Sequence, residues 1–170
     1  MPISEKMEKA LNKQINEELA SSYIYLSMKA YFDSLGLAGF SSWMNTQVQE
    51  EIFHASKFYN HIVQRGGRVV LEKIEAPKEQ WSNVLDAFQD ALKHEQHITK
   101  CINDLVDLAE SEKDHASRSF LQWFVDEQVE EEDNVGGVVD RLQMAKDGQS
   151  LLMVDKELAQ RQPLFSMQNE

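Results

Sequence analysis

The chain has 170 residues, of which 42% are hydrophobic and 27% charged, and its formal net charge is -12. This length suits one domain with a full core, which we expect to extend over residues 1–170. The acidic charge disfavours nucleic acid and anionic membranes as partners and favours cations. A single cysteine excludes a disulfide framework, and the lack of an apolar run of signal-peptide or membrane-span length predicts a cytoplasmic protein.

Hydrophobic residues recur with helical spacing along most of the chain, and glycine and proline are few. This pattern predicts an all-α protein with four long helices and a short, amphipathic fifth helix. The third helix is expected to begin near Trp81 with Ser82 as its N-cap, and Gly148 is expected to separate the fourth helix from the fifth. The predicted helices cover, in order, about residues 4–33, 37–65, 81–110, 116–146 and 150–161.

The segment between the second and third predicted helices, residues 65–80, determines the connectivity. It contains Gly66, Gly67 and Pro77 and is long for a turn between bundle helices. Stretched at about 3.3 Å per residue, it could run the whole length of helices that are about 42 Å long. The other two links between long helices are short, so each pair is expected to be antiparallel. The sequence therefore predicts a four-helix bundle, over about residues 4–146, with one long crossover between helices two and three.

Each of the four long helices carries a glutamate in an otherwise largely apolar stripe. In the second helix, steps of four and three lead from Met44 through Val48 to Glu51, and then through Ala55 to Phe58. The four interrupting acids are Glu18, Glu51, Glu95 and Glu131. Each lies about 15 residues from an end of its helix, so the bundle should bring all four to a similar height. Four ionised carboxylates in one dry layer would repel one another, and two divalent cations would balance their charge.

Neighbouring residues indicate which metal such a layer would hold. Glu18, Glu51 and His54 are predicted to bind a first ion, with Glu51 able to bridge to a second. The candidate ligands of the second ion are Glu95, Glu131 and Gln128. Carboxylates with one imidazole suit iron or manganese better than a structural zinc. Because the fourth helix offers glutamine in place of the first acid of a Glu-x-x-His motif, we expect the second ion to be held more loosely.

Three further acids, Glu50, Glu127 and Glu130, could form a third, all-carboxylate position at the side of this pair. Glu50 adjoins Glu51 in sequence, whereas Glu127 and Glu130 share one face of the fourth helix. Such a position could serve as an exit for oxidised iron. The alternative is that these are solvated surface acids in the run DEQVEEED.

The segments NEELASSYIY, QVQEEIFHASKFYNHI, KHEQHIT and FLQWFVDEQVEEE resemble the bacterial non-haem ferritins in order and spacing over nearly the whole chain. The resemblance implies a ferritin-like bundle with a ferroxidase centre, in which O2 or peroxide oxidises Fe2+ and the iron is stored as a ferric oxide mineral. It implies the same ligands for two irons, the same third site, and Tyr25 as a candidate electron donor beside the centre. It also implies a homo-oligomeric shell of 24 subunits, with the short fifth helix at a four-fold axis.

Related families and other functions would require residues or features that differ from those of this resemblance. Ile52 stands where bacterioferritins carry a haem-binding methionine, so we expect no haem, and the single Cys101 excludes the cysteine-rich domain of rubrerythrins. A small di-iron oxygenase would share the centre but would need an apolar substrate pocket, which Phe120 and Phe124 could line. A purely structural helical bundle would bind no metal. The sequence favours the ferritin interpretation over both alternatives.

Overall fold

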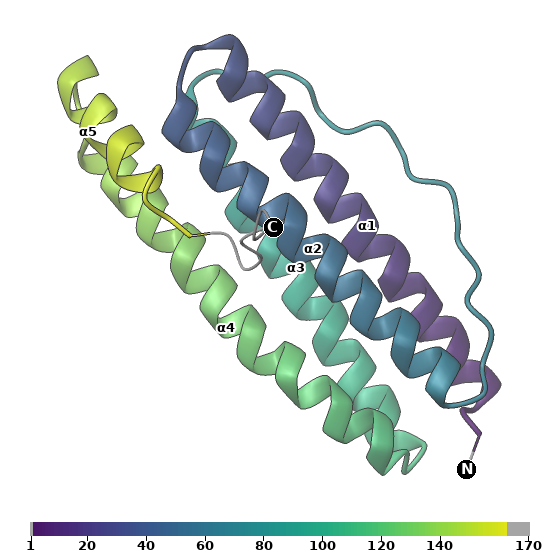
Figure 1. The fold of residues 1–170 in the computed structure, drawn as a ribbon. Coiled ribbons are helices and arrows are strands. Elements are labelled where there is room, and N and C mark those ends of the chain that lie inside the picture. Colours follow the sequence, from purple (N-terminus) through teal and green to yellow (C-terminus); the bar gives the residue numbers. More distant parts are fainter. Residues whose placement is uncertain (1, 163–170) are drawn as a thin grey trace, which may run out of the picture.

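Five α-helices form the secondary structure of residues 2–162, the part of the chain that the computed structural model describes (Figure 1). The helices are α1 (Glu5–Ser34), α2 (Ala38–Gln64), α3 (Val84–Ser111), α4 (His115–Met144) and α5 (Gly148–Leu158). α1 and α2 run antiparallel, as do α3 and α4, and the two pairs pack into one bundle. The predicted all-α bundle with a short fifth helix is confirmed. Within these residues, no helix combines the length and the apolar character that crossing a bilayer requires.

The long crossover between α2 and α3 runs along the bundle beside α1 (Figure 1). Side chains of α1 bind its backbone at several heights. Near the start of the crossover, the Asn12 amide donates to the Arg68 carbonyl oxygen at 2.9 Å and accepts from the Val70 amide at 2.7 Å. Further along, the Ser27 hydroxyl donates to the Lys78 carbonyl oxygen at 2.7 Å. These bonds satisfy backbone groups of a segment that has no secondary structure of its own.

Capping side chains determine where the helices begin. The Asn83 side chain accepts a hydrogen bond from the Asp86 amide at 2.9 Å, so Asn83 is the N-cap and α3 begins at Val84. The prediction of Ser82 as N-cap was wrong, because it is the next side chain, that of Asn83, that caps the helix. The Ser82 backbone amide donates to the Asp86 carboxylate at 2.9 Å. Asp147 caps α5 in the same way, which makes Gly148 the first residue of that helix rather than a break before it.

The buried apolar side chains form two clusters, and every long helix passes from one cluster to the other at its buried acid. In α1, Ile15 belongs to one cluster and Tyr25 to the other, with Glu18 between them. In α4, Phe124 and Val135 are divided in the same way around Glu131. The charged layer expected from the sequence therefore lies between two separate apolar cores, near the middle of the bundle.

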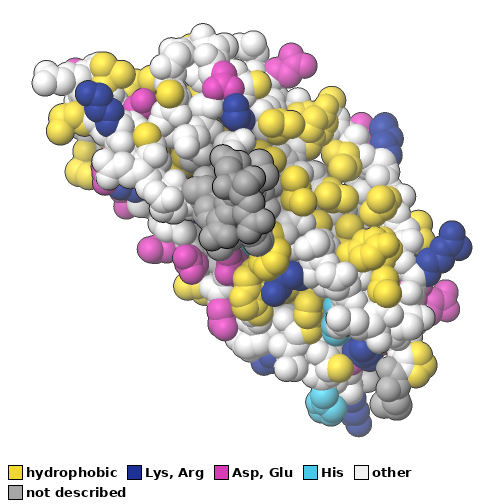
Figure 2. All heavy atoms as spheres, viewed as in Figure 1, with side chains coloured by type: hydrophobic (Ala, Val, Ile, Leu, Met, Phe, Trp, Pro, Cys, Tyr) yellow, Lys and Arg dark blue, Asp and Glu magenta, His cyan; other side chains and the backbone are white. Residues whose placement is uncertain are grey.

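Large hydrophobic side chains are also exposed on the α1–α2 pair, and Figure 2 shows hydrophobic side chains gathered over these helices on one face. The exposed large hydrophobic residues of the two helices are Tyr23, Leu26, Ile52, Tyr59 and Val63. A gathered set of this kind is typical of a surface that contacts another protein.

α5 is attached to the beginning of α2. The Phe40 amide donates to the Asp155 carboxylate at 2.9 Å, and Val154 and Leu158 of α5 are buried in the apolar cluster that contains Phe40. The backbones approach closely at Gly39, where an added Cβ atom would lie 1.7 Å from the Asp155 carbonyl oxygen. Only glycine permits this contact.

Replacing Gly39 with alanine is therefore expected to displace α5 and to lower the free energy of unfolding by about 1–3 kcal/mol, the usual cost of overpacking. Gly136→Ala is the matched control, since a Cβ atom there meets nothing within 4 Å and alanine favours a helix interior by up to about 1 kcal/mol. Calorimetric melting of both variants measures the difference. Equal melting temperatures would contradict the tight packing of α5 on α2.

Candidate metal centre

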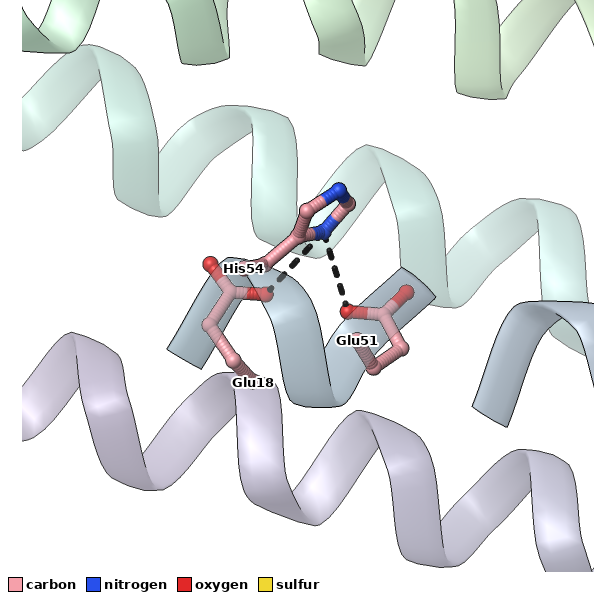
Figure 3. Close-up of side chains that lie close together, drawn as sticks. All are labelled: Glu18, Glu51 and His54. Carbon is pink, nitrogen blue, oxygen red and sulfur yellow. Dashed lines mark ion pairs between the residues drawn. The ribbon is translucent and has the colours of Figure 1, made fainter. Parts of the chain in front are cut away.

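Glu18 of α1 and the pair Glu51 and His54 of α2 point toward one another inside the bundle (Figure 3). Their i,i+3 spacing places Glu51 and His54 on the same face of α2. His54 Nδ1 lies 3.5 Å from Glu51 Oε2 and 4.0 Å from Glu18 Oε2. All three side chains are buried, and each offers one ligand atom within 4.8 Å of the others. The structure thus brings together the ligands predicted for the first ion.

This group has unpartnered polar atoms of the kind that a cation satisfies. Glu18 Oε2 and His54 Nε2 are buried without a hydrogen-bond partner among residues 2–162. The other oxygen of Glu18 accepts a hydrogen bond from the Gln14 amide at 2.9 Å. A buried polar atom without a partner is costly, so two such atoms in one group favour a bound ion. Oxygen and imidazole ligands suit a divalent metal such as iron.

Glu95 of α3 and Glu131 of α4 supply the opposite side of the layer, as the sequence predicts. Burial raises the pKa of each carboxyl group to about 8, and the charge of Glu131 adds to the rise at Glu95. His54 connects the two sides, because His54, Glu127 and Glu131 can also place one ligand atom each within 4.8 Å of the others. His54 Nε2 lies 3.6 Å from Glu127 Oε1.

The electrostatics of the layer reflect acids packed together without enough positive charge. Burial raises the pKa of Glu18 well above 4.5, and the neighbouring Glu51 adds to this rise. Burial also raises the pKa of Glu51. At His54, burial lowers the pKa, but the acids Glu127 and Glu51 outweigh that effect and raise it well above 6.5. The metal-free layer therefore retains protons that a pair of cations would displace.

Three polar side chains orient Glu95 and Glu131, the acids predicted for the second position. The Tyr25 hydroxyl donates a hydrogen bond to Glu95, and the Gln47 amide nitrogen donates to Glu131 Oε2 at 3.0 Å. The Gln128 amide nitrogen lies 3.3 Å from Glu95 Oε2 and from the Glu95 carbonyl oxygen. Gln128, a candidate ligand in the sequence, therefore acts in this structure as a hydrogen-bond donor to Glu95.

Tyr25→Phe is expected to raise the pKa of Glu95 above about 8, because the lost hydrogen bond favours the ionised carboxylate. Since a metal binds that ionised form, the pH at which Co2+ binding is half complete should rise by about half a unit or more. Tyr23→Phe is the control, since Tyr23 lies on the same helix and is exposed. An equal pH midpoint in both variants, measured from Co2+ absorption, would contradict the role of this hydrogen bond.

The residues predicted for a third position are only partly brought together. Glu50 is buried and Glu127 is half-buried, and the charge of Glu127 adds to the burial that raises the pKa of Glu50. Glu130 is exposed, and it is absent from the ligand groups that the described residues form. Glu50 already has a cationic partner, since Arg161 Nη2 lies 2.9 Å from its Oε2 atom.

Sequence reasoning missed Gln14, Gln47 and Arg161. Gln14 and Gln47 each lie one turn before a ligand on its own helix, at positions four residues ahead of Glu18 and Glu51. A glutamine one helical turn before an acid in an apolar stripe is a sequence signal that could have identified both residues. Arg161 follows α5 and gave no such signal, because its contact with α2 depends on how α5 folds back.

Comparison with known proteins agrees with this geometry. A family described as a ferritin-like domain matches residues 8–145. The chain is similar to a bacterial non-heme ferritin of Bacteroides fragilis, with 43% identity over 159 residues, 94% of this chain and 99% of the relative. A bacterial non-heme ferritin of Staphylococcus epidermidis is 39% identical over 160 residues, which cover 94% of this chain and 96% of that protein.

Solved structures give the same result. The chain is similar to an open pore ferritin from the hyperthermophilic archaeon Archaeoglobus fulgidus, with a TM-score of 0.93 and 51% sequence identity. That alignment covers 94% of this chain and 99% of the other. The resemblance to bacterial non-haem ferritins predicted from the sequence motifs is therefore confirmed, and the chain belongs to the ferritin family.

Proposed function

We propose that the protein is an iron-storage ferritin that oxidises Fe2+ at a carboxylate-bridged di-iron centre and stores the product as a ferric oxide mineral. Family membership supports iron storage with ferroxidase activity in general. The observation that carries the specific proposal is the buried group of Glu18, Glu51 and His54. In this group two ligand-type atoms lack a hydrogen-bond partner among the described residues.

Each residue of the layer has a distinct task in this proposal. Glu18, Glu51 and His54 bind the first Fe2+ ion, and Glu51 also reaches the second. Glu95 and Glu131 bind the second ion, while Tyr25, Gln47 and Gln128 hold those two carboxylates in position. Two Fe2+ ions supply two electrons, and O2 takes these with two protons to become hydrogen peroxide. Where peroxide is the oxidant, the same electrons and protons convert it to two water molecules.

Tyr25 is assigned the electron-donor role in this proposal on the basis of the family resemblance and its contact with Glu95. It is fully buried, and burial together with the neighbouring Glu95 raises the pKa of its hydroxyl group well above 10. The hydroxyl group therefore keeps its proton and donates to Glu95. In this proposal Tyr25 is a catalytic residue. It contacts Glu95, a ligand of the second iron, and supplies a further electron to the centre.

Oxidised iron leaves through the third position, formed by Glu50, Glu127 and Glu130, and hydrolyses in an enclosed cavity. The proposal assigns that cavity to a shell of 24 identical subunits with α5 at a four-fold axis. The exposed hydrophobic side chains of α1 and α2 support association between copies of the chain. The cytoplasmic location and the single domain over residues 1–170 stay predictions.

Aerobic addition of Fe2+ at many ions per subunit, followed by size-exclusion chromatography with detection of iron and protein, tests this function. A very large particle that elutes with hundreds of oxidised irons is the expected result. Rapid oxidation by a small particle with about two irons per chain would favour the oxygenase alternative instead. Absence of oxidation would contradict both and would leave a structural bundle.

A further inference from the structure

Arg161, which follows α5, contacts three side chains along one face of α2, and Figure 1 shows the chain continuing from α5 toward the middle of the bundle. Its guanidinium carbon lies 4.7 Å from the centre of the Trp43 ring. One nitrogen donates to Gln47 Oε1, and Nη2 donates to Glu50 Oε2 at 2.9 Å. Spacings of four and three residues place Trp43, Gln47 and Glu50 on successive turns, so one planar fork reaches all three.

The contact continues through Gln47 to the metal layer. A guanidinium group only donates hydrogen bonds, so Gln47 must present its oxygen to Arg161. Its amide nitrogen then faces Glu131 and donates to Oε2 at 3.0 Å. The guanidinium group at one end therefore determines the donor order of this chain of bonds. Arg161 thus orients Glu131 through Gln47.

The contact with Glu50 places a positive charge where the third ion would bind. The side chains of Arg161 and Glu50 are 21% and 8% exposed, so water screens their interaction only in part. A divalent cation that used Glu50 would meet the guanidinium at close range, and two cations at one carboxylate repel each other.

We propose that Arg161 is a positioning residue that occupies Glu50 as a built-in cation and limits the affinity of the third position. The inference rests on the proposed third position. It adds a residue that limits how tightly that position binds a cation, which the three acids alone would not do. Iron that leaves the di-iron pair must displace the guanidinium from Glu50 and is therefore held there only weakly. Weak retention favours onward movement into the cavity, while Gln47 and Glu131 remain oriented as long as Arg161 is in place.

Calorimetric titration of the complete assembly with Zn2+, which is not oxidised, tests the proposal without the iron reaction. Arg161→Gln is expected to tighten the weakest, third binding step at least about tenfold, a change of about 1.4 kcal/mol. The first step should change by less than about threefold, because Glu18, Glu51 and His54 are intact. The second step should weaken, because Gln47 loses the contact that orients it toward Glu131. Arg161→Lys keeps the charge at Glu50 and should leave the third step near its original affinity.

Arg141→Gln is the matched control, since it removes the same charge from the exposed ion pair with Glu157, whose Oε1 lies 2.8 Å from Arg141 Nη1. It should leave all three steps unchanged. An unchanged or weaker third step in Arg161→Gln, or no third step in any variant, overturns the role of Arg161. Failure of the first two steps in every variant overturns the di-iron centre instead, so the two results are distinguishable.

Discussion

Replacing Glu51 with alanine is expected to slow the oxidation of the first two Fe2+ ions per subunit at least about a hundredfold. Loss of a side chain that only supports a metal ligand commonly costs 10–100-fold, and Glu51 is proposed to touch both ions. It lies 3.5 Å from His54 Nδ1 and within the group that Glu18 completes. Stopped-flow absorbance after mixing two Fe2+ per subunit with aerobic buffer measures the rate.

Glu51→Gln is a second variant, in which the side chain keeps nearly the same shape and loses its charge. It should lose a similar part of the rate, and it keeps the test valid even if alanine disturbs the fold. Glu130→Ala is the control, because Glu130 is exposed and belongs to the proposed exit rather than to the pair. It should leave the first turnover intact and alter only later turnovers. If the first turnover were equally fast in the Glu51 and Glu130 variants, the assignment of the centre would be wrong.

Binding of two divalent ions is expected to release at least two protons, one from Glu95 and one from Glu131, when the pH is well below 8. Both carboxyl groups have a pKa of about 8 in the metal-free protein, because burial disfavours their charged form. At about pH 6.5 each is almost fully protonated, and a metal binds only the ionised form. Zn2+ titration in two buffers with different ionisation enthalpies measures the number of protons released.

Glu95→Gln should release about one proton fewer than the original protein at the same pH. The release should also fall as the pH rises through 8, since the free carboxylates are by then ionised before the metal binds. Release of less than about one proton per subunit at pH 6.5 would mean that these acids are already charged in the metal-free layer. The pKa values inferred from burial would then be wrong.

The same raised pKa values determine how the stability of the metal-free fold depends on pH. In the unfolded chain these glutamates titrate near 4.5, so between about pH 4.5 and 8 the folded state binds protons that the unfolded chain has released. The free energy of unfolding therefore decreases across this range and levels off above about 8. Bound cations remove this penalty, so their stabilising effect should grow with pH over the same range.

Much of the fold and of the centre could be predicted because each long helix has an apolar stripe that one glutamate interrupts at about the same distance from a helix end. Long apolar stripes with few helix breakers predict a helical bundle, and one acid per stripe at similar height predicts a charged layer. The confirmed bundle places Glu18, Glu51 and His54 together because Glu51 and His54 share a face that α1 covers. Depth in a helix is a local quantity, so it can be counted from the sequence.

What could not be predicted depends on the direction of individual side chains. Helix counting could not show that Gln128 donates to Glu95, because the same amide nitrogen also lies within reach of the Thr99 hydroxyl group. The predicted start of α3 was wrong because Ser82 and Asn83 are both good capping residues, and only the backbone conformation decides which of them is the N-cap. Arg161 lies far from Glu50 in sequence and meets it only after α5 packs on α2.

Because the apolar core is divided into two clusters, iron bound between them would affect the rigidity of the bundle. Each helix of the bundle is held at both ends by hydrocarbon contacts, but at its midpoint it meets the buried acids. Among the described residues of this layer, Glu18 Oε2 and His54 Nε2 lack a hydrogen-bond partner. A pair of iron ions would serve there as a temporary part of the interior and would join the two cores. When oxidised iron departed, protons would have to replace it on the acids, so each cycle of the proposed oxidation would loosen and tighten the same cross-section of the bundle.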